Sequence, residues 1–196
     1  TNTNTNTDTN TNIRFTCYKI ESLKELLKKK DGTLSYRHAL LIYLQIGNQI
    51  ETLIKDNIGI LTLNIDDILV IHTDNERYKS KFIIHNTEYF SQLVNKNKEK
   101  QIEIFKPYNK VKSFLSNELY MNNAIPFYIS PKTTYYSLAI LIAHCLKPID
   151  NLNQFIDIYN ENIYKKHIEM IAETKLYWGL LRCIEKKPED RYYLYI

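Results

Sequence analysis

The residues best suited to chemistry are two adjacent aspartates and five scattered histidines. Asp66 and Asp67 offer carboxylates for a cation, and Asp74 follows shortly after. Adjacent side chains on a strand point to opposite faces, so Asp66 and Asp67 do not share one ion if a strand begins there. The histidines lack the spacing of zinc motifs; they stand at 38, 72, 85, 144 and 167. The sequence therefore predicts no cofactor and no metal site, with Asp67 as the only candidate ligand.

Candidate nucleophiles are also without an activating context. Cys17, Cys145 and Cys183 form no CxxC pair, and an odd number argues against a disulfide framework. This cysteine usage favours a reducing compartment, such as the cytoplasm. Ser137 is not part of a GxSxG motif, so nothing supports a hydrolase. We therefore expect no catalytic residue of these kinds.

The elements that must position any site are organised around residues 133–146. This stretch is apolar on nearly every face but shorter than the roughly 20 residues that span a bilayer. Such a segment is typical of a buried central helix. A capping-box spacing at Ser22 predicts a short helix after it, and a second helix is expected after Ser35, where apolar residues recur at steps of three and four.

Further periodic segments complete the predicted architecture. Apolar spacing predicts helices at 152–163 and 176–184, and two β-prone runs at 68–71 and 82–84 predict one small hairpin. The lysine-rich run 95–100 is interpreted as a solvated loop or helix end. The predicted fold class is therefore mainly α with a single β-hairpin.

Composition limits the number of domains and the classes of partner. The chain has 196 residues, 44% of them hydrophobic, enough for one domain over residues 13–196. The TN repeat at 1–12 has no apolar residue and predicts a disordered low-complexity tail. The net charge of +4 is spread along the chain, which does not favour a nucleic acid partner. No membrane-spanning run is visible.

The order and spacing of these segments resemble the C-terminal lobe of a protein kinase over residues 22–196. Residues 57–70 align without gaps to the catalytic loop and the strand after it, and 114–119 is similar to the end of the activation segment. The start of 133–146 resembles the family's central helix. Residues 180–191 resemble its last signature, a string containing Cys, Pro and Arg. The resemblance implies a kinase C-lobe-like helical domain.

The catalytic positions of this family are degenerate here. The His-Arg-Asp motif becomes Ile60, Leu61 and Thr62, so a neutral threonine replaces the carboxylate that accepts the substrate's proton. The catalytic-loop lysine becomes Asn64, and the metal-binding asparagine becomes Asp67. The metal-binding Asp-Phe-Gly motif falls at 85–87, where Asn86 is a degenerate position and no aspartate is present. The residues before Ser22 are too few and too polar to form the family's first lobe.

One structural pair of the family is retained. Glu118 matches the glutamate that ends the activation segment, and Arg191 matches the arginine that the family places against it. The resemblance implies a partly buried ion pair whose loss costs about 3 to 5 kcal/mol. The alternative is two surface charges worth less than about 1 kcal/mol.

The predicted function is that of a catalytically inactive kinase-like domain, a pseudokinase C-lobe, that binds another protein. KIND modules are relatives of this lobe that bind peptides, and the chain resembles them in class. One alternative is the C-terminal half of a split or truncated serine/threonine kinase, active only with a first lobe from another chain. Another is a structural component of a larger assembly or virus particle. Tyrosines at 120–136 and 192–195 mark a candidate contact surface.

Overall fold

The computed structural model describes residues 17–73, 79–108, 114–122, 124–149 and 161–196. The helices are α1 (Leu23–Lys29), α2 (Tyr36–Lys55), α3 (Asn117–Met121), α4 (Thr133–Leu146), α6 (Glu161–His167) and α7 (Lys175–Cys183), with short 3-10 turns at Ile65–Asp67, Glu169–Ile171 and Pro188–Asp190. The strands are β1 (Lys19–Ser22), β2 (Ile58–Ile60), β3 (Ile68–His72), β4 (Ser80–Ile84), β5 (Phe90–Lys96), β6 (Glu99–Ile104) and β7 (Phe127–Ile129). The predicted tail at 1–12, Asp74 and most of the helix predicted at 152–163 lie outside the described residues.

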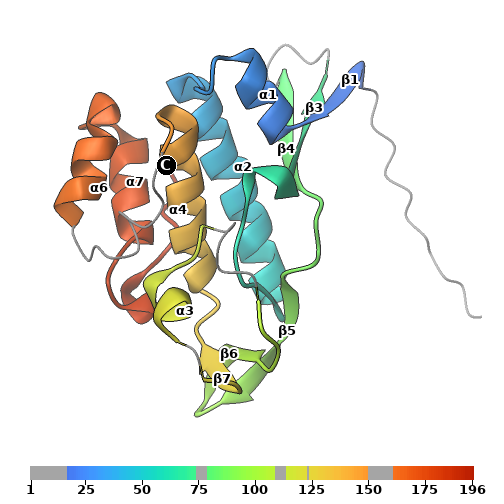
Figure 1. Ribbon diagram of the computed structural model, residues 1–196, viewed down its shortest axis with the longest axis vertical. Coiled ribbons are helices and arrows are strands. Elements are labelled where there is room, and N and C mark those ends of the chain that lie inside the picture. The colour runs from blue at the N-terminus through green and yellow to red at the C-terminus, as the bar shows by residue number, and fades with distance from the viewer. Residues whose placement is uncertain (1–16, 74–78, 109–113, 123, 150–160) are drawn as a thin grey trace, which may run out of the picture.

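Helix α4 runs through the middle of the molecule, with α2 on one side and α7 on the other (Figure 1). All of its residues except His144 are buried. A helix that is apolar all round is stable only when other elements cover every face, so the prediction of a central helix at 133–146 is confirmed. No helix among the described residues combines the length and the apolar character needed to cross a membrane.

The first two helices begin as their capping residues predict. The Ser22 side chain accepts a hydrogen bond from the Glu25 N–H, while the Glu25 carboxylate accepts one from the Ser22 N–H, which completes the capping box. Ser35 caps α2. The buried face of α2 repeats at steps of three and four and packs on α4; it consists of Ala39, Ile42, Tyr43, Ile46, Gly47 and Ile50.

The first sheet has three antiparallel strands in the order β1-β3-β4. Strands β3 and β4 are the predicted hairpin, in the register Ile68↔Ile84, and β1 adds a strand at one edge. The other edge is covered by α2: Gln45 accepts a hydrogen bond from the Phe82 N–H (2.7 Å), and Gln49 donates to the Phe82 carbonyl (2.9 Å). These amides replace the next strand along β4.

The prediction of a mainly α fold with one small hairpin is wrong. A second antiparallel sheet, in the order β2-β5-β6-β7, lies at the end of the molecule opposite α1, so the protein is an α/β fold (Figure 1). Strands β5 and β6 are joined at Asn97 and Lys98, which have φ values of +54° and +70°. Two consecutive residues with positive φ form the tight turn of a hairpin. Residues 95–100 are therefore the tip of a hairpin, and their polar composition reflects exposure on both faces.

Candidate functional site

Helix α4 holds in place the segment between β2 and β3, which the sequence resemblance aligns with the kinase catalytic loop. The Thr134 hydroxyl donates to the Ile60 carbonyl. The Ser137 hydroxyl accepts from the Leu63 N–H (2.8 Å) and lies 3.1 Å from the Thr62 hydroxyl. Residues three apart share one face of a helix, so Thr134 and Ser137 both face this segment. Neutral hydroxyl groups therefore fix the loop.

Thr62, which the resemblance aligns with the kinase catalytic aspartate, is only 1% exposed. Its hydroxyl hydrogen bonds with Ser137, and a hydroxyl is far too weak a base to take a proton from a substrate at neutral pH. Leu61, at the arginine position, is buried in a small core between α3 and the second sheet. Ile60 is buried in the main core. None of the three side chains is available for acid or base chemistry.

The structure brings together Asp67 and Asn86, which the resemblance aligns with the metal-binding positions of kinases. Asn86 Nδ2 donates to Asp67 Oδ1 (2.7 Å), and the Asn64 N–H donates to Asp67 Oδ2 (2.7 Å). Burial raises the pKa of the Asp67 carboxyl, although both hydrogen bonds oppose the rise. Both oxygens of this carboxylate therefore serve the fold. Over the described part of the chain, no three His, Cys, Asp or Glu side chains gather as a possible metal site.

The neighbouring residues Asp66 and His85 also make local contacts. Asp66 forms an exposed ion pair with Lys24 (3.0 Å), and His85 Nε2 lies 2.9 Å from the Asp66 carbonyl oxygen. Asp66 and Asp67 thus have different partners; both lie in the 3-10 turn before β3, so the strand alternation considered for them does not apply.

Glu118 on α3 and Arg191 near the C-terminus form a bidentate ion pair. Arg191 Nη1 lies 2.5 Å from Glu118 Oε1, and Nη2 lies 3.0 Å from Oε2. Arg191 is 1% exposed, and its Nε donates to the Glu185 carbonyl (2.7 Å). Burial opposes ionisation of Glu118, but the Arg191 guanidinium outweighs it and lowers the pKa of the Glu118 carboxyl. The pair joins α3 to the segment after α7.

Glu21 on β1 is the centre of a second buried charge cluster, which the sequence did not indicate. Its carboxylate is paired with Lys19 (2.8 Å), Lys29 and His72 (2.8 Å). Burial alone raises the pKa of Glu21, but hydrogen bonds from these three side chains lower it to about 2. The cluster ties β1 to α1 and β3, since its members come from all three elements.

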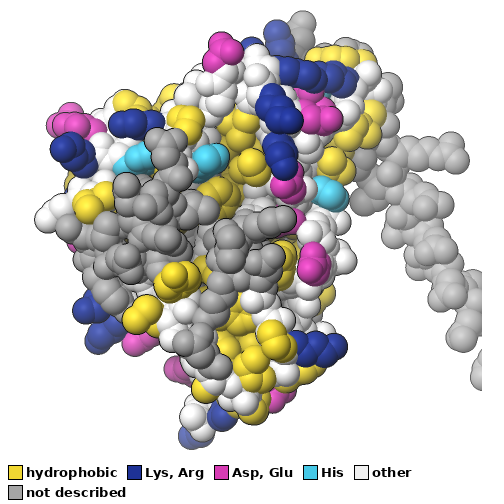
Figure 2. Space-filling model, viewed as in Figure 1, with side chains coloured by type: hydrophobic (Ala, Val, Ile, Leu, Met, Phe, Trp, Pro, Cys, Tyr) yellow, Lys and Arg dark blue, Asp and Glu magenta, His cyan; other side chains and the backbone are white. Residues whose placement is uncertain are grey.

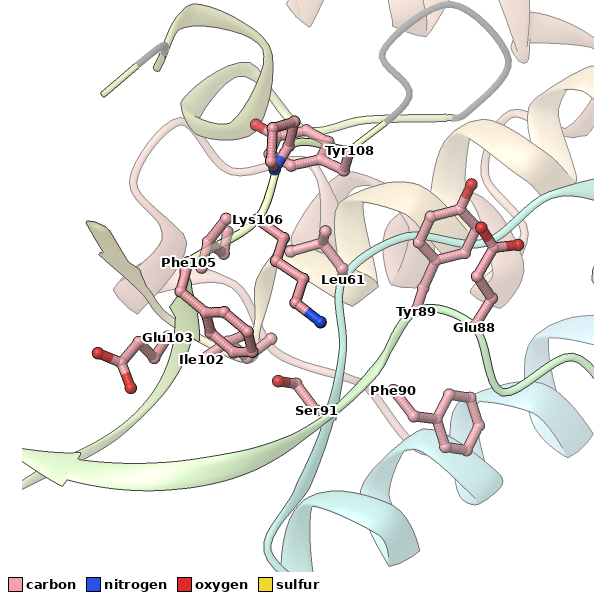
Figure 3. Close-up of a pocket in the computed structure, with 12 residues that line it drawn as sticks. Leu61, Glu88, Tyr89, Phe90, Ser91, Ile102, Glu103, Phe105, Lys106 and Tyr108 are labelled. Atoms are coloured by element: carbon pink, nitrogen blue, oxygen red, sulfur yellow. The ribbon is translucent and has the colours of Figure 1, made fainter. Parts of the chain in front are cut away.

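An open cavity of about 370 Å³ lies beside Leu61, between β5 and β6 (Figure 3). We name it the β5–β6 cleft; its walls are residues 88–91 and 102–108, and Leu61 lies at its base. Lys106 extends into the cleft from the β6 side, while Glu88 and Tyr89 lie on the opposite wall (Figure 3). The cleft was not anticipated, because no helix or strand was predicted in either of its walls.

Neither protein families nor curated proteins offer a relative with which to compare this geometry. The sequence matches no family model, and no curated protein matches it significantly. Any function must therefore be argued from the residues and their arrangement.

Proposed function

We propose that the chain is a catalytically inactive relative of the kinase C-terminal lobe and that it acts as a protein-binding module. The observation that carries the proposal is Thr62: it is buried at the position of the catalytic base and hydrogen bonded to Ser137. The contact between Asp67 and Asn86 supports it, because the carboxylate aligned with the family's metal-binding asparagine is instead used within the fold. The Glu118–Arg191 pair supports the kinship.

The proposed partner is a protein rather than a nucleic acid or a membrane. Acidic and basic side chains lie side by side on the face seen in Figure 2, which differs from the continuous basic surface that phosphate backbones select. Exposed apolar side chains include Phe105 in the wall of the cleft and Met121 at the end of α3. Apolar groups of this kind are typical of protein contacts.

A reducing compartment, such as the cytoplasm, fits this proposal. Cys145 and Cys183 are both free and buried. Burial raises the pKa of each thiol to about 12, so neither is activated for reaction. Both act as small apolar side chains within the main core.

Two measurements separate this proposal from its rivals. Thermal unfolding with ATP and Mg²⁺ should give an unchanged Tm, whereas a split kinase that retains nucleotide affinity would be stabilised by linkage. Light scattering on the purified protein should show a small species of constant mass. Concentration-dependent growth into large species would instead favour a structural component of a particle.

A further inference from the structure

The β5–β6 cleft arises because two paired strands separate. The last register pair between β5 and β6 is Leu93↔Ile102. Beyond it, β5 pairs with β2, as in Ser91↔Gly59, while β6 pairs with β7, as in Ile104↔Phe127. Each strand keeps a partner on its outer side, but no register pair joins the two inner edges. The cleft is thus a wedge between two strand edges that face each other.

Main-chain groups point into this wedge. On the outer side of β5, the Leu61 N–H donates a hydrogen bond to the Tyr89 carbonyl (2.9 Å), and the Leu93 N–H donates one to the Asn57 carbonyl (2.8 Å). The main-chain groups of Tyr89 and Leu93 therefore face β2. Alternation along a strand therefore turns the main-chain N–H and C=O of Phe90 toward the cleft, while its ring packs against the main core. The Phe90 N–H donates to Thr87 O (3.0 Å), so the carbonyl of Phe90 is the group directed at an incoming chain.

The side chains of the cleft combine an apolar base with Lys106 and Glu103 on the β6 wall and Glu88 on the other. The Glu103 carboxylate accepts a hydrogen bond from the Tyr128 hydroxyl (2.8 Å) and points away from the cleft (Figure 3). Leu61, Ile102 and Ile104 are buried there. The Lys106 ammonium lies 5.3 Å from the Phe105 ring, and Phe105 is 59% exposed. Among the described residues, no carboxylate lies within ion-pair distance of Lys106, and no cation lies within that distance of Glu88. Lys106 and Glu88 are therefore available to the charged groups of a bound chain.

We propose that the β5–β6 cleft binds an extended peptide of a partner protein, which adds as a strand to one inner edge and places an acidic side chain against Lys106. Unpaired strand edges bind extended chains through the main chain, and neighbouring pockets select alternate side chains. Leu61, Ile102 and Ile104 accept an apolar residue of the peptide, and Glu88 disfavours a second acidic residue at the far end. This inference rests on the proposed protein-binding function and names its site.

Selection of peptides on the intact protein tests this inference. A displayed library of random peptides of about nine residues, the length of a long strand, is selected on the wild-type chain. We expect the selected peptides to share an acidic residue near an apolar one. Their synthetic, fluorescein-labelled forms should lose at least about tenfold in affinity for Lys106→Glu, because an attractive pair becomes repulsive. Lys98→Glu makes the same charge change at the hairpin tip, outside the cleft, and should bind as wild type does.

Two further arms test the geometry. Replacing the peptide's acidic residue by lysine should restore binding to Lys106→Glu. N-methylation of the peptide amides that face the strand edge should abolish binding, because these amides donate hydrogen bonds to it. N-methylation of the intervening amides, which face away, should not. Failure to select any peptide, or equal binding to Lys106→Glu and wild type, overturns the cleft proposal. Neither result bears on catalytic inactivity, because nucleotide binding and oligomeric mass are measured separately.

Discussion

At the residue scale, the Glu118–Arg191 pair shows how the surroundings of a charge decide its contribution to stability. Arg191 is almost fully buried and its guanidinium has two matched contacts with Glu118. The Arg182–Glu185 pair is similar in chemistry, but both of its side chains are substantially exposed. Solvent and side-chain entropy cancel most of the benefit of such surface pairs.

We expect Glu118→Gln to lower the free energy of unfolding by about 3 kcal/mol, because it leaves a buried guanidinium without its counter-charge. The control Glu185→Gln should cost less than about 1 kcal/mol. Urea denaturation of the two variants checks this difference. Equal losses would mean that Glu118 and Arg191 behave as surface charges.

The low pKa of Glu21 makes stability depend on pH. The folded-state pKa, about 2, lies below the ordinary value of 4.5, so the carboxylate stabilises the fold above pH 4.5. This contribution is lost as the pH falls from 4.5 toward 2. Glu21→Gln should therefore be less stable than wild type at pH 6, by about 2 kcal/mol, and the difference should shrink by pH 3. A difference that does not change with pH would contradict this account; urea denaturation across this pH range measures it.

At the scale of elements, α4 both fills the core and holds the degenerate loop. Ser137→Ala removes the group that accepts from the Leu63 N–H and contacts Thr62. Because this leaves a buried donor unsatisfied, we expect a loss of about 2 kcal/mol in the free energy of unfolding. Thr52→Ala deletes an exposed hydroxyl on α2 and should change it by less than about 0.5 kcal/mol. Chemical denaturation compares the two, and similar small losses would show that the α4 hydroxyls do not brace the loop.

Helices α1, α2, α4 and α7 were predictable from the sequence because their signals are local, whereas the short helix α3 was not predicted and α6 begins only where the helix predicted at 152–163 ends. Apolar spacing placed α2, and an apolar run of limited length placed α4 with its bounds. Strand β6 carries only two apolar residues, Ile102 and Ile104, between charged ones, and its pairing depends on partners distant in sequence. Such pairing leaves a weak local pattern, so the second sheet was missed.

The candidate site was predictable only in part, for similar reasons. Alignment with the family's catalytic loop marked Thr62, Asp67 and Asn86 as positions to inspect. It did not reveal that Thr134 and Ser137 hold this loop, since hydroxyls on an apolar helix look like ordinary core residues. The β5–β6 cleft depends on where two strands stop pairing, which no periodicity in the sequence encodes.

At the scale of the whole molecule, two sheets lie at different ends of a helical core centred on α4 (Figure 1). The loop that the resemblance aligns with the kinase catalytic loop is held by hydrogen bonds of Thr62, Thr134 and Ser137. In the open cleft beside it, Lys106 and Glu88 form no ion pair with any described residue. Structural contacts thus lie in this loop, and the proposed binding chemistry lies in the adjacent strands.

The most direct test of catalytic inactivity is thermal unfolding during titration with ATP and Mg²⁺, with EDTA replacing the metal as control. A ligand at about 100 times its Kd stabilises a protein by about 2.7 kcal/mol, which shifts Tm measurably. Our account predicts that Tm stays constant across the titration. A saturable rise in Tm that requires Mg²⁺ would contradict it.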